Sequence, residues 1–427
     1  MLLILCVAFS LCLLVMLKYI YHDLAPGKIF SLFWIGQILL LTIGGYSFLI
    51  FKYTGIIFIL VCLLCFNIGP MSVQTESMAD YVEERKCYIS FHERRLLFLL
   101  VFLIVLGFYN PIQTIVSHGF SLSSLLDFSS LLKVNNSLSV SRYTENTSNG
   151  LFTQFFLIFS YTAPLLGGFC LPALASKKGK WICCASLLPL LFAGLTQGVK
   201  MCIITSILVF ISGYYVSCIL LGKKIIIKTS TIIKFVLGIV VLFAVLLLSM
   251  MFRIGRFDLS TFYVVTDKFV SYAFGHLPAF DLWFDKQPWI SDTLTYGAKM
   301  FLGITNFLGI LKREQGLYSE FVTISNGGAV TNVYTIFRIF IDDFGIILVP
   351  IVFFFLGVLI QRVYRRLLQL LNYRINSMIC VSFLFMTFWS FVTSVFVYTS
   401  YICMFAAFYF ILCFCTQKVD KGAHFKK

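Results

Sequence analysis

Long apolar runs recur along almost the whole chain, and they constrain its fold more than any other feature. Each run holds about 20 mainly apolar residues, enough for one α-helix to cross a hydrocarbon core of ~30 Å. Hydrophobic residues fill 60% of the 427 positions, compared with roughly 45–50% in soluble domains. The runs are continuous and do not alternate, which excludes a transmembrane β-barrel. The sequence therefore predicts an all-α, polytopic bundle of transmembrane helices.

The runs predict about eleven spans within one integral membrane domain that covers residues 1–427. Short turns join most of the spans, but two longer and more polar segments, at about 112–150 and 251–335, interrupt this pattern. A segment as long as 251–335 offers a place for chemistry on one face of the membrane. The predicted spans are 2–20, 31–50, 54–70, 96–112, 151–171, 181–196, 201–221, 231–251, 336–360, 376–397 and 400–416.

Basic residues are distributed unevenly between the two sides of the predicted bundle. With the C-terminus inside, the short outer loops hold only Lys52 and Lys200, whereas every inner loop is basic. Because Lys and Arg are enriched in cytoplasmic loops, we expect the N-terminus and both long segments to lie outside. The same bias accounts for the net charge of +15, and no nucleic-acid-binding motif accompanies it. The inner groups begin with Lys18 and Lys28, Arg94 and Arg95, and Lys177 and Lys178, and continue with Lys223 and Lys224, Arg365 and Arg366, and Lys426 and Lys427.

No cofactor or metal site emerges from the residue spacing. The fourteen cysteines lie in predicted spans or near Cys87, and none lies in the two outer segments, where an exported disulfide scaffold would have them. They are best explained as small apolar residues of a helix bundle. Cys62 and Cys65 lack a second ligand pair, and the outer Asp residues are too scattered for a paired-carboxylate metal site. Nothing resembles a Ser-His-Asp set or a phosphate-binding Gly-rich loop.

Aromatic residues are concentrated in the segment 251–335, which carries Trp283 and Trp289 close to His276 and Asp281. Flat aromatic faces can stack on sugar rings. They also form the aromatic belts found where membrane proteins meet the lipid headgroups. Composition does not separate these two interpretations.

Five basic residues at the outer ends of spans are candidates for binding an anion. A guanidinium group grips a diphosphate with paired hydrogen bonds, which lysine cannot reproduce. The alternative for each residue alone is contact with lipid headgroups by a long, snorkelling side chain. The five are Arg142, Lys200, Arg253, Arg256 and Arg338.

Tyr334, Arg338 and Asp342 recur every four residues, so they share one face if the segment is helical. Asp342 would then lie about one turn inside the apolar zone, where ionisable groups are costly and usually face a cavity or the bundle interior. The alternative is a structural Arg338–Asp342 pair with no part in catalysis. If a hydroxyl must be deprotonated here, the candidate bases are His276, Asp281, Asp342 and Asp343.

Two segments carry a family resemblance, together with the eleven-span layout and the late outer loop. Ala273-Phe-Gly-His-Leu-Pro-Ala-Phe-Asp281 and Thr331-Asn-Val-Tyr-Thr-Ile-Phe-Arg-Ile-Phe-Ile-Asp-Asp-Phe-Gly345 resemble the bacterial O-antigen polymerase (Wzy) family of oligosaccharide repeat unit polymerases. Some members carry an arginine followed eleven positions later by glycine in each of two outer loops. This chain departs from that pattern, because Thr153 stands eleven positions after Arg142.

The resemblance implies a GT-C-like glycosyltransferase of the bacterial inner membrane. Such enzymes move a growing glycan from undecaprenyl diphosphate to the non-reducing end of a new lipid-linked repeat unit at the periplasmic face. They use no nucleotide sugar and no obligatory metal. The implied partners are the undecaprenyl-diphosphate-linked oligosaccharide, membrane lipids and a chain-length regulator of the Wzz type. On this basis Arg253, Arg256, Arg338 and Lys200 would neutralise the diphosphate, His276, Asp281 or Asp342 would accept a proton, and aromatic residues such as Trp283 would hold the glycan.

Three other functions remain open at this stage. An O-antigen ligase would share the layout and the lipid-linked substrate. A lipid-linked oligosaccharide flippase or another transporter would usually show related halves and broken helices near the midplane, and this sequence shows no such symmetry. A membrane scaffold without enzymatic activity is disfavoured by the ionisable residues at the outer ends of the predicted spans.

Overall fold

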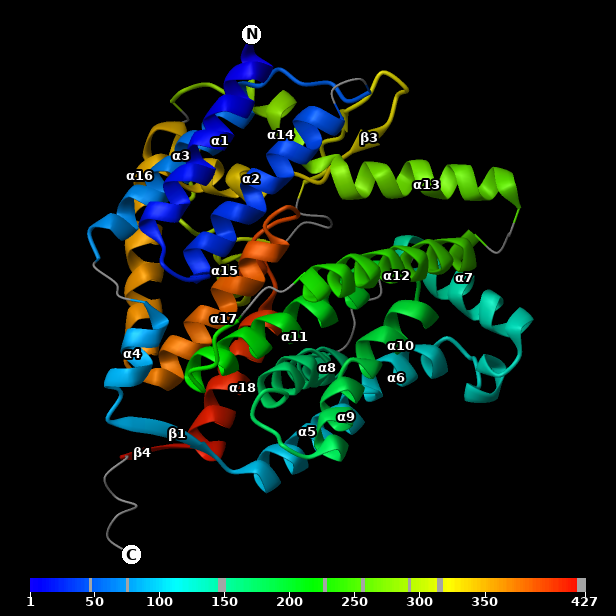
Figure 1. Ribbon diagram of the computed structural model, residues 1–427. Helices are drawn as coiled ribbons and strands as arrows, with labels where there is room; N and C mark the ends of the chain where they lie inside the picture. Colours follow the sequence, from blue (N-terminus) through cyan, green and yellow to red (C-terminus); the bar gives the residue numbers. More distant parts are fainter. Residues whose placement is uncertain are drawn as a thin grey trace, which may run out of the picture. The chain divides into compact units, whose positions relative to one another are not determined.

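The computed structural model describes residues 1–45, 48–73, 77–144, 151–225, 229–254, 258–290, 293–312 and 318–420. Within these ranges the chain is mostly α-helical, with only short strands (Figure 1). It divides into two compact units. The first combines Met1–Arg85 with Val270–Ile402, and the second combines Lys86–Phe269 with Cys403–Lys427.

The first unit combines the N-terminal part of the chain with a later part, and α3 packs against α16 where the two parts meet. Its elements are α1 (Leu2–Ile20), α2 (Pro26–Gly44), α3 (Thr54–Met71), α4 (Met78–Glu84), α14 (His276–Phe284), α15 (Leu302–Phe307), β2 (Val322–Thr323), β3 (Val330–Thr331), α16 (Ile336–Leu368), α17 (Tyr373–Trp389) and the 3₁₀-helix η2 (Val395–Val397).

The second unit holds most of the middle of the chain. Its elements are β1 (Cys87–Phe91), α5 (Glu93–Gly107), α6 (Tyr109–Ser117), the 3₁₀-helix η1 (Leu122–Leu125), α7 (Phe128–Thr144), α8 (Leu151–Cys170), α9 (Lys177–Ala185), α10 (Leu188–Thr196), α11 (Lys200–Leu220), α12 (Thr229–Ile254) and β4 (Thr416–Asp420). The boundary between the units falls within α13 (Leu259–Phe274) and α18 (Thr399–Cys415).

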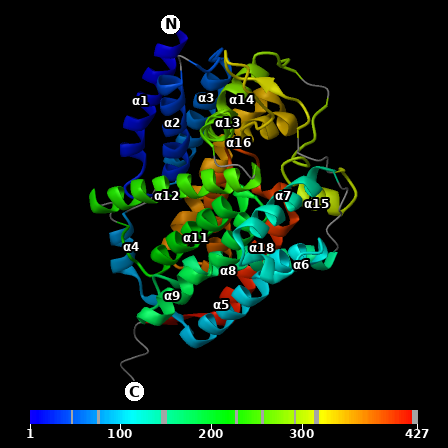
Figure 2. The ribbon, with the colours of Figure 1, turned by 90° about the vertical axis from the view of Figure 1, so that its right-hand side faces the viewer.

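In the first unit, α3 and α16 make the most extensive helix–helix contact. Gly69 and Gly357 permit it, because a Cβ atom at Gly357 would lie 2.0 Å from the Phe66 carbonyl oxygen and one at Gly69 would lie 2.4 Å from that of Phe354. Such close backbone approach through small residues is typical of membrane helices. Helices α1, α2 and α3 lie side by side in both ribbon views (Figure 2).

Helix α16 is interrupted at Gly345, where φ is +74°. This region of φ is open to glycine and strained for other residues. The break separates a short first part, which carries Arg338, Asp342 and Asp343, from the long apolar part that follows. These three charged residues therefore lie in the first turns of α16, before its long apolar part.

In the second unit, α8 packs along α11 and also along α5. Strands β1 and β4 pair antiparallel, with Cys87 opposite Asp420 and Phe91 opposite Thr416. The His92 amide donates to the carbonyl of Cys415, which continues the pairing toward the helices that flank the two strands. A small apolar cluster of Ile115, Val134 and Leu138 supports α6 and α7.

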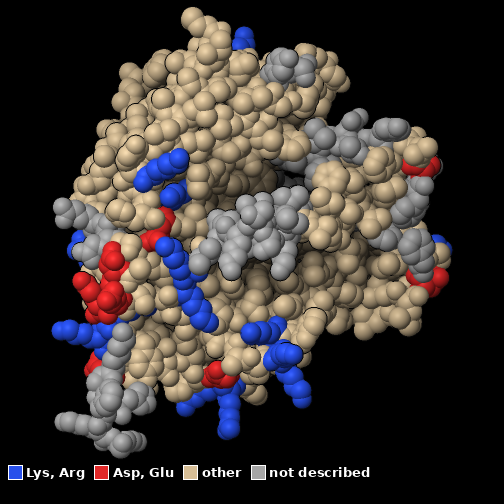
Figure 3. Space-filling model, viewed as in Figure 1, with Lys and Arg blue, Asp and Glu red and all other residues tan. Residues whose placement is uncertain are grey.

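The helical, membrane-protein character that the sequence predicts is confirmed. Each predicted span overlaps a helix, but α2 ends at Gly44 and α17 at Trp389, before the predicted ends at 50 and 397. Two other spans are interrupted, because α5 and α6 break at Phe108, and α9 and α10 are separate helices. Seven described segments are long and apolar enough to cross a membrane, and the number of crossings beyond them stays a prediction. Much of the surface in Figure 3 carries no charged side chain. The seven are α1, α2, α3, α5 with α6, α9 with α10, α11 and α16.

The two long polar segments contain regular structure. The segment 112–150 includes η1 and α7, and the segment 251–335 includes α13, α14, α15 and the β2–β3 hairpin. In the hairpin, Val322 pairs with Thr331 and Thr323 with Val330. These elements place side chains of the second segment against the first part of α16.

The close crossing of α3 and α16 leads to a test of stability. We expect Gly357→Ala to lower the free energy of unfolding by about 1–3 kcal/mol, because the added methyl group meets backbone that has no room to move. The matched control is Gly36→Ala in α2, where a Cβ atom would meet nothing within 4 Å. Thermal denaturation of the purified protein in detergent compares the two. Equal melting temperatures for both variants would contradict the crossing.

Candidate functional site

Arg338 lies at the start of α16 inside a cage of aromatic rings. Its guanidinium carbon is 3.8 Å from the centre of the Tyr318 ring, 4.0 Å from that of Tyr334 and 4.6 Å from that of Trp283. Only 8% of the residue is exposed. Cation–π attraction of this kind contributes about 2 kcal/mol when the cation is desolvated. The structure thus brings together Trp283, Tyr334 and Arg338, three residues that the sequence singled out.

The hydrogen-bonding capacity of Arg338 is largely unused. One terminal nitrogen, Nη2, lies 3.0 Å from Oε2 of Glu320, whose side chain is 56% exposed. The other two nitrogens, Nε and Nη1, are buried and have no hydrogen-bond partner among the described residues. A buried donor without a partner costs about 1–3 kcal/mol, and more if it is charged. An anion that reached these two nitrogens would accept both remaining hydrogen bonds.

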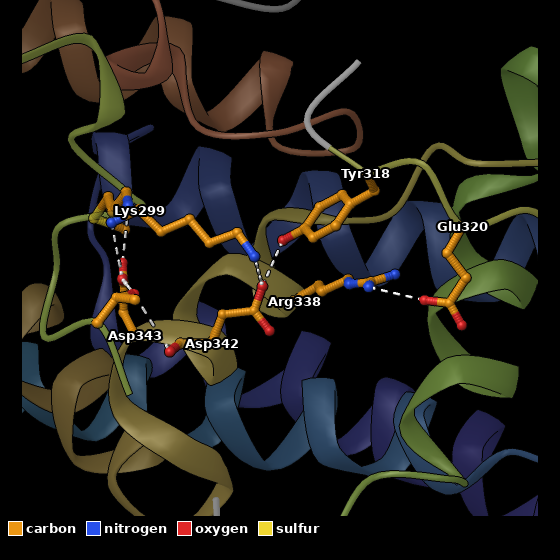
Figure 4. A network of polar contacts seen from close by, with 8 residues as sticks. Lys299, Tyr318, Glu320, Arg338, Asp342 and Asp343 are labelled. Atoms are coloured by element: carbon orange, nitrogen blue, oxygen red, sulfur yellow. Dashed lines mark hydrogen bonds and ion pairs between the residues drawn. The ribbon is translucent and has the colours of Figure 1, made fainter. Parts of the chain in front are cut away.

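Asp342 lies one turn after Arg338 and bonds to a different cation (Figure 4). Its Oδ2 accepts a hydrogen bond of 2.5 Å from Nζ of Lys299 and one of 2.9 Å from the hydroxyl of Tyr318. Its Oδ1 has no hydrogen-bond donor among the described residues. The direct Arg338–Asp342 pair that the sequence allowed is therefore wrong: Arg338 pairs with Glu320, and Asp342 with Lys299.

Tyr318 joins the two halves of this cluster. Its ring contacts Arg338, its hydroxyl donates to Asp342, and Nζ of Lys299 lies 4.6 Å from its ring centre. Burial, followed by the negative charge of Asp342, raises the pKa of the Tyr318 hydroxyl well above its usual value. The hydroxyl is therefore a hydrogen-bond donor across the physiological pH range.

Asp343 has a structural task in the same turn of α16. Its carboxylate accepts hydrogen bonds from the hydroxyl of Thr295, from the amide of Lys299 at 3.0 Å and from the amide of Met300 at 2.9 Å. It is fully buried. These bonds fasten the turn that contains Lys299 onto α16, so Asp343 positions Lys299 opposite Asp342. A carboxylate so enclosed is a poor candidate for the base.

A cavity of about 170 Å³ opens beside the Lys299–Asp342 pair. Both charged side chains line it, and each is partly accessible, at 28% for Lys299 and 21% for Asp342. Asp342 is therefore the candidate base that a ligand can reach. The other lining residues are Gln287, Pro288, Thr293, Thr295, Ile341, Gly345 and Ile346.

Asp281 lies in α14 and caps the first turn of another helix, α3. Its two carboxylate oxygens accept hydrogen bonds from the amides of Lys52, Tyr53 and Gly55 at 2.6, 2.7 and 2.8 Å, and a longer one of 3.4 Å from Ile56. The first amides of a helix have no partner within the helix, and a carboxylate satisfies them well. Burial raises the pKa of Asp281, and the four amides act in the opposite direction. The geometry favours a structural role over the catalytic role that the sequence suggested.

His276, the other candidate base, begins α14 and is 1% exposed. Its ring packs against Trp34, with 6.4 Å between ring centres, and against Phe391 at 5.4 Å. The surroundings are aromatic, and the histidine does not share the accessible cavity with Asp342. We therefore assign it to packing.

The remaining basic candidates belong to the second unit or lie outside the described residues. Lys200 begins α11 in the second unit. Arg142 and Arg253 lie in α7 and α12, but their side chains fall outside the described part of the chain, as does the whole of Arg256. The structure adds Lys299, Tyr318 and Glu320, which the sequence analysis missed. They stand 18 or more positions before their partners on α16, and no local spacing links them to it.

Comparison with protein-family models, with curated proteins and with solved structures found no match for this chain.

The cap of α3 leads to a second stability test. We expect Asp281→Asn to destabilise the protein by roughly 1–3 kcal/mol, because the amide group would turn N–H donors toward backbone N–H donors. The control is Asp285→Asn, which lies one turn later, is exposed and, among the described residues, accepts a side-chain hydrogen bond from the hydroxyl of Thr54 alone. Melting temperatures in detergent measure both. If the Asp281→Asn protein were as stable as the control, the proposed cap would be contradicted.

Proposed function

We propose that this protein is a surface-polysaccharide polymerase of the O-antigen type. It would transfer a growing glycan from undecaprenyl diphosphate to the non-reducing end of a new lipid-linked repeat unit. The observation that carries the proposal is the buried guanidinium of Arg338, which keeps two nitrogens without a hydrogen-bond partner among the described residues. A lipid diphosphate would satisfy those donors.

In this proposal the chain crosses the bacterial inner membrane eleven times as a GT-C-like bundle. The N-terminus and the segments 112–150 and 251–335 are periplasmic, and the C-terminus is cytoplasmic. The distribution of Lys and Arg between loops supports this orientation. The seven described segments with the length and hydropathy of membrane spans support the crossings but not their direction. The substrate would then be bound on the periplasmic side by Trp283, Lys299, Tyr318 and Glu320.

The reaction requires the protein chiefly to stabilise the negative charge of the leaving diphosphate. The acceptor hydroxyl oxygen forms a bond to the anomeric carbon of the donor glycan, and the bond from that carbon to the diphosphate oxygen breaks. The electron pair leaves with the diphosphate. A guanidinium fixed in a buried site stabilises the negative charge that develops on the diphosphate more strongly than a solvated guanidinium does. The aromatic rings around Arg338 hold it in place for this purpose.

The proton of the attacking hydroxyl goes to a carboxylate. Asp342 is the candidate whose side chain is partly accessible, and its Oδ1 accepts no hydrogen bond from the described residues. Tyr318 and Lys299 hold its other oxygen, so the orientation of the group is set before the substrate arrives. The proton then passes to solvent through the opening of the cavity. A separate chain-length regulator of the Wzz type is the partner expected from the family resemblance.

The test of the whole proposal is the glycan ladder of a bacterial strain that lacks this gene. Loss of a polymerase leaves single repeat units on the lipid core, and the complemented strain regains the ladder. Loss of an O-antigen ligase or of a flippase removes the repeat units altogether. An unchanged ladder in the deletion strain would overturn the proposal.

The test of the site uses Arg338 variants in the same strain. We expect Arg338→Ala to reduce long polymer by about 100-fold or more, as removal of a transition-state hydrogen-bond donor does elsewhere. Arg338→Lys should restore little, because an ammonium group keeps the charge but lacks the planar fork. The control is Arg362→Ala, an exposed arginine in the long second part of α16. Membrane fractions checked by immunoblot show whether each variant is inserted. Full-length polymer from an inserted Arg338→Ala protein would contradict the role assigned to Arg338.

A further inference from the structure

The cavity beside Asp342 differs in its chemistry from the cage around Arg338. Among the described residues, its lining combines one carboxylate, one ammonium group, an amide and two threonines with the apolar side chains of Pro288, Ile341 and Ile346. Lys299, the cation among these residues, is already paired with Asp342. The cavity therefore presents no net positive charge to a ligand, and it disfavours a diphosphate. Neutral ligands that carry hydroxyl groups suit it better.

The size of the cavity narrows the choice further. Its volume of about 170 Å³ is below the ~300–1,000 Å³ of pockets that enclose a drug-sized ligand. One six-membered sugar ring can enter, whereas an oligosaccharide must extend out through the opening. Sugar rings have hydroxyl groups at their edges and C–H groups on their faces, which matches a wall that mixes polar and apolar side chains.

The cavity also lies close to the anion cage, within the same unit. Tyr318 contacts Arg338 through its ring and Asp342 through its hydroxyl, so the width of one side chain separates the two places (Figure 4). A reaction that joins a sugar hydroxyl to a carbon bearing a diphosphate needs this pairing: a neutral ring at one place and an anion at the other, with reacting atoms about 3–3.5 Å apart.

We propose that this cavity is the acceptor subsite and binds the terminal, non-reducing sugar of the incoming repeat unit as a neutral ring. One hydroxyl of that ring donates to Oδ1 of Asp342, and the rest of the repeat unit leaves through the opening near Thr293. Lys299 is a positioning residue, because it holds Oδ2 of Asp342 and leaves Oδ1 for the sugar. The name acceptor rests on the proposed polymerase function; the binding of a neutral sugar ring does not.

A variant that blocks the opening tests the subsite. Thr293 is exposed and lines the cavity, so Thr293→Trp adds an indole at an exposed part of the cavity wall. The matched control is Ile290→Trp, which adds the same ring three residues earlier, at a side chain that is 77% exposed and does not line the cavity. In the complemented deletion strain we expect Thr293→Trp to reduce long polymer about 100-fold and Ile290→Trp to leave the ladder intact.

A binding measurement separates this proposal from the polymerase proposal. The purified full-length protein in lipid nanodiscs is mixed with methyl glycosides of neutral hexoses and N-acetylhexosamines, and saturation-transfer NMR detects contact. We expect signals from at least one glycoside with wild-type protein and with Ile290→Trp, and at least a tenfold weaker signal with Thr293→Trp. Inorganic diphosphate should not displace the sugar.

The outcomes assign failure to one proposal or the other. If Thr293→Trp removes sugar binding but deletion of the gene leaves the ladder unchanged, the sugar subsite is supported and the polymerase proposal is overturned. A ladder that is lost with Arg338→Ala and fully retained with Thr293→Trp overturns the subsite and leaves the polymerase standing. Absence of a signal from every glycoside, or displacement by diphosphate, also overturns the subsite.

Discussion

The contact on which the site depends is the capping of α3 by the Asp281 carboxylate. Four backbone amides at the start of α3 point at one side chain of α14, more than 220 positions away in the sequence. Tyr53, the residue before α3, adopts a left-handed backbone conformation with φ of +69°, which costs on the order of 1–3 kcal/mol in a non-glycine residue. The buried carboxylate compensates for this strain by satisfying amides that would otherwise have no partner.

The position of α16 follows from that contact in two steps. Helix α3 packs tightly against α16 where glycine on each helix lets the backbones meet, and α14 packs against α3 through its capping residue. Trp283 of α14 and Arg338 of α16 are brought together as a result. The break at Gly345 and the Asp343 bonds to the turn at 295–300 then set Lys299 opposite Asp342. A small number of polar contacts thus organises a site at the entrance of an apolar bundle.

Sequence reasoning identified part of this site, and the reasons for success and failure are physical. Tyr334, Arg338 and Asp342 were found because their spacing in the sequence is local. Arg338 and Asp342 do lie one turn apart in α16, but Tyr334 precedes the helix, so the expectation that all three share one helical face was wrong for Tyr334. Asp281 and His276 were named for their chemistry, but burial decides what such groups do, and burial is set by distant residues. Lys299, Tyr318 and Glu320 could not be found, because nothing in their own surroundings in the sequence points to α16.

The sequence alone determined that this chain is a helical membrane protein, because runs of about 20 apolar residues have few other stable arrangements. It located the long apolar helices, but not the helices within the polar segments 112–150 and 251–335. Only the tertiary structure decided which charges meet. Ion pairs and aromatic cages depend on side chains from separate segments. Helical spacing therefore suggested an Arg338–Asp342 pair, whereas the structure pairs Lys299 with Asp342 and Glu320 with Arg338.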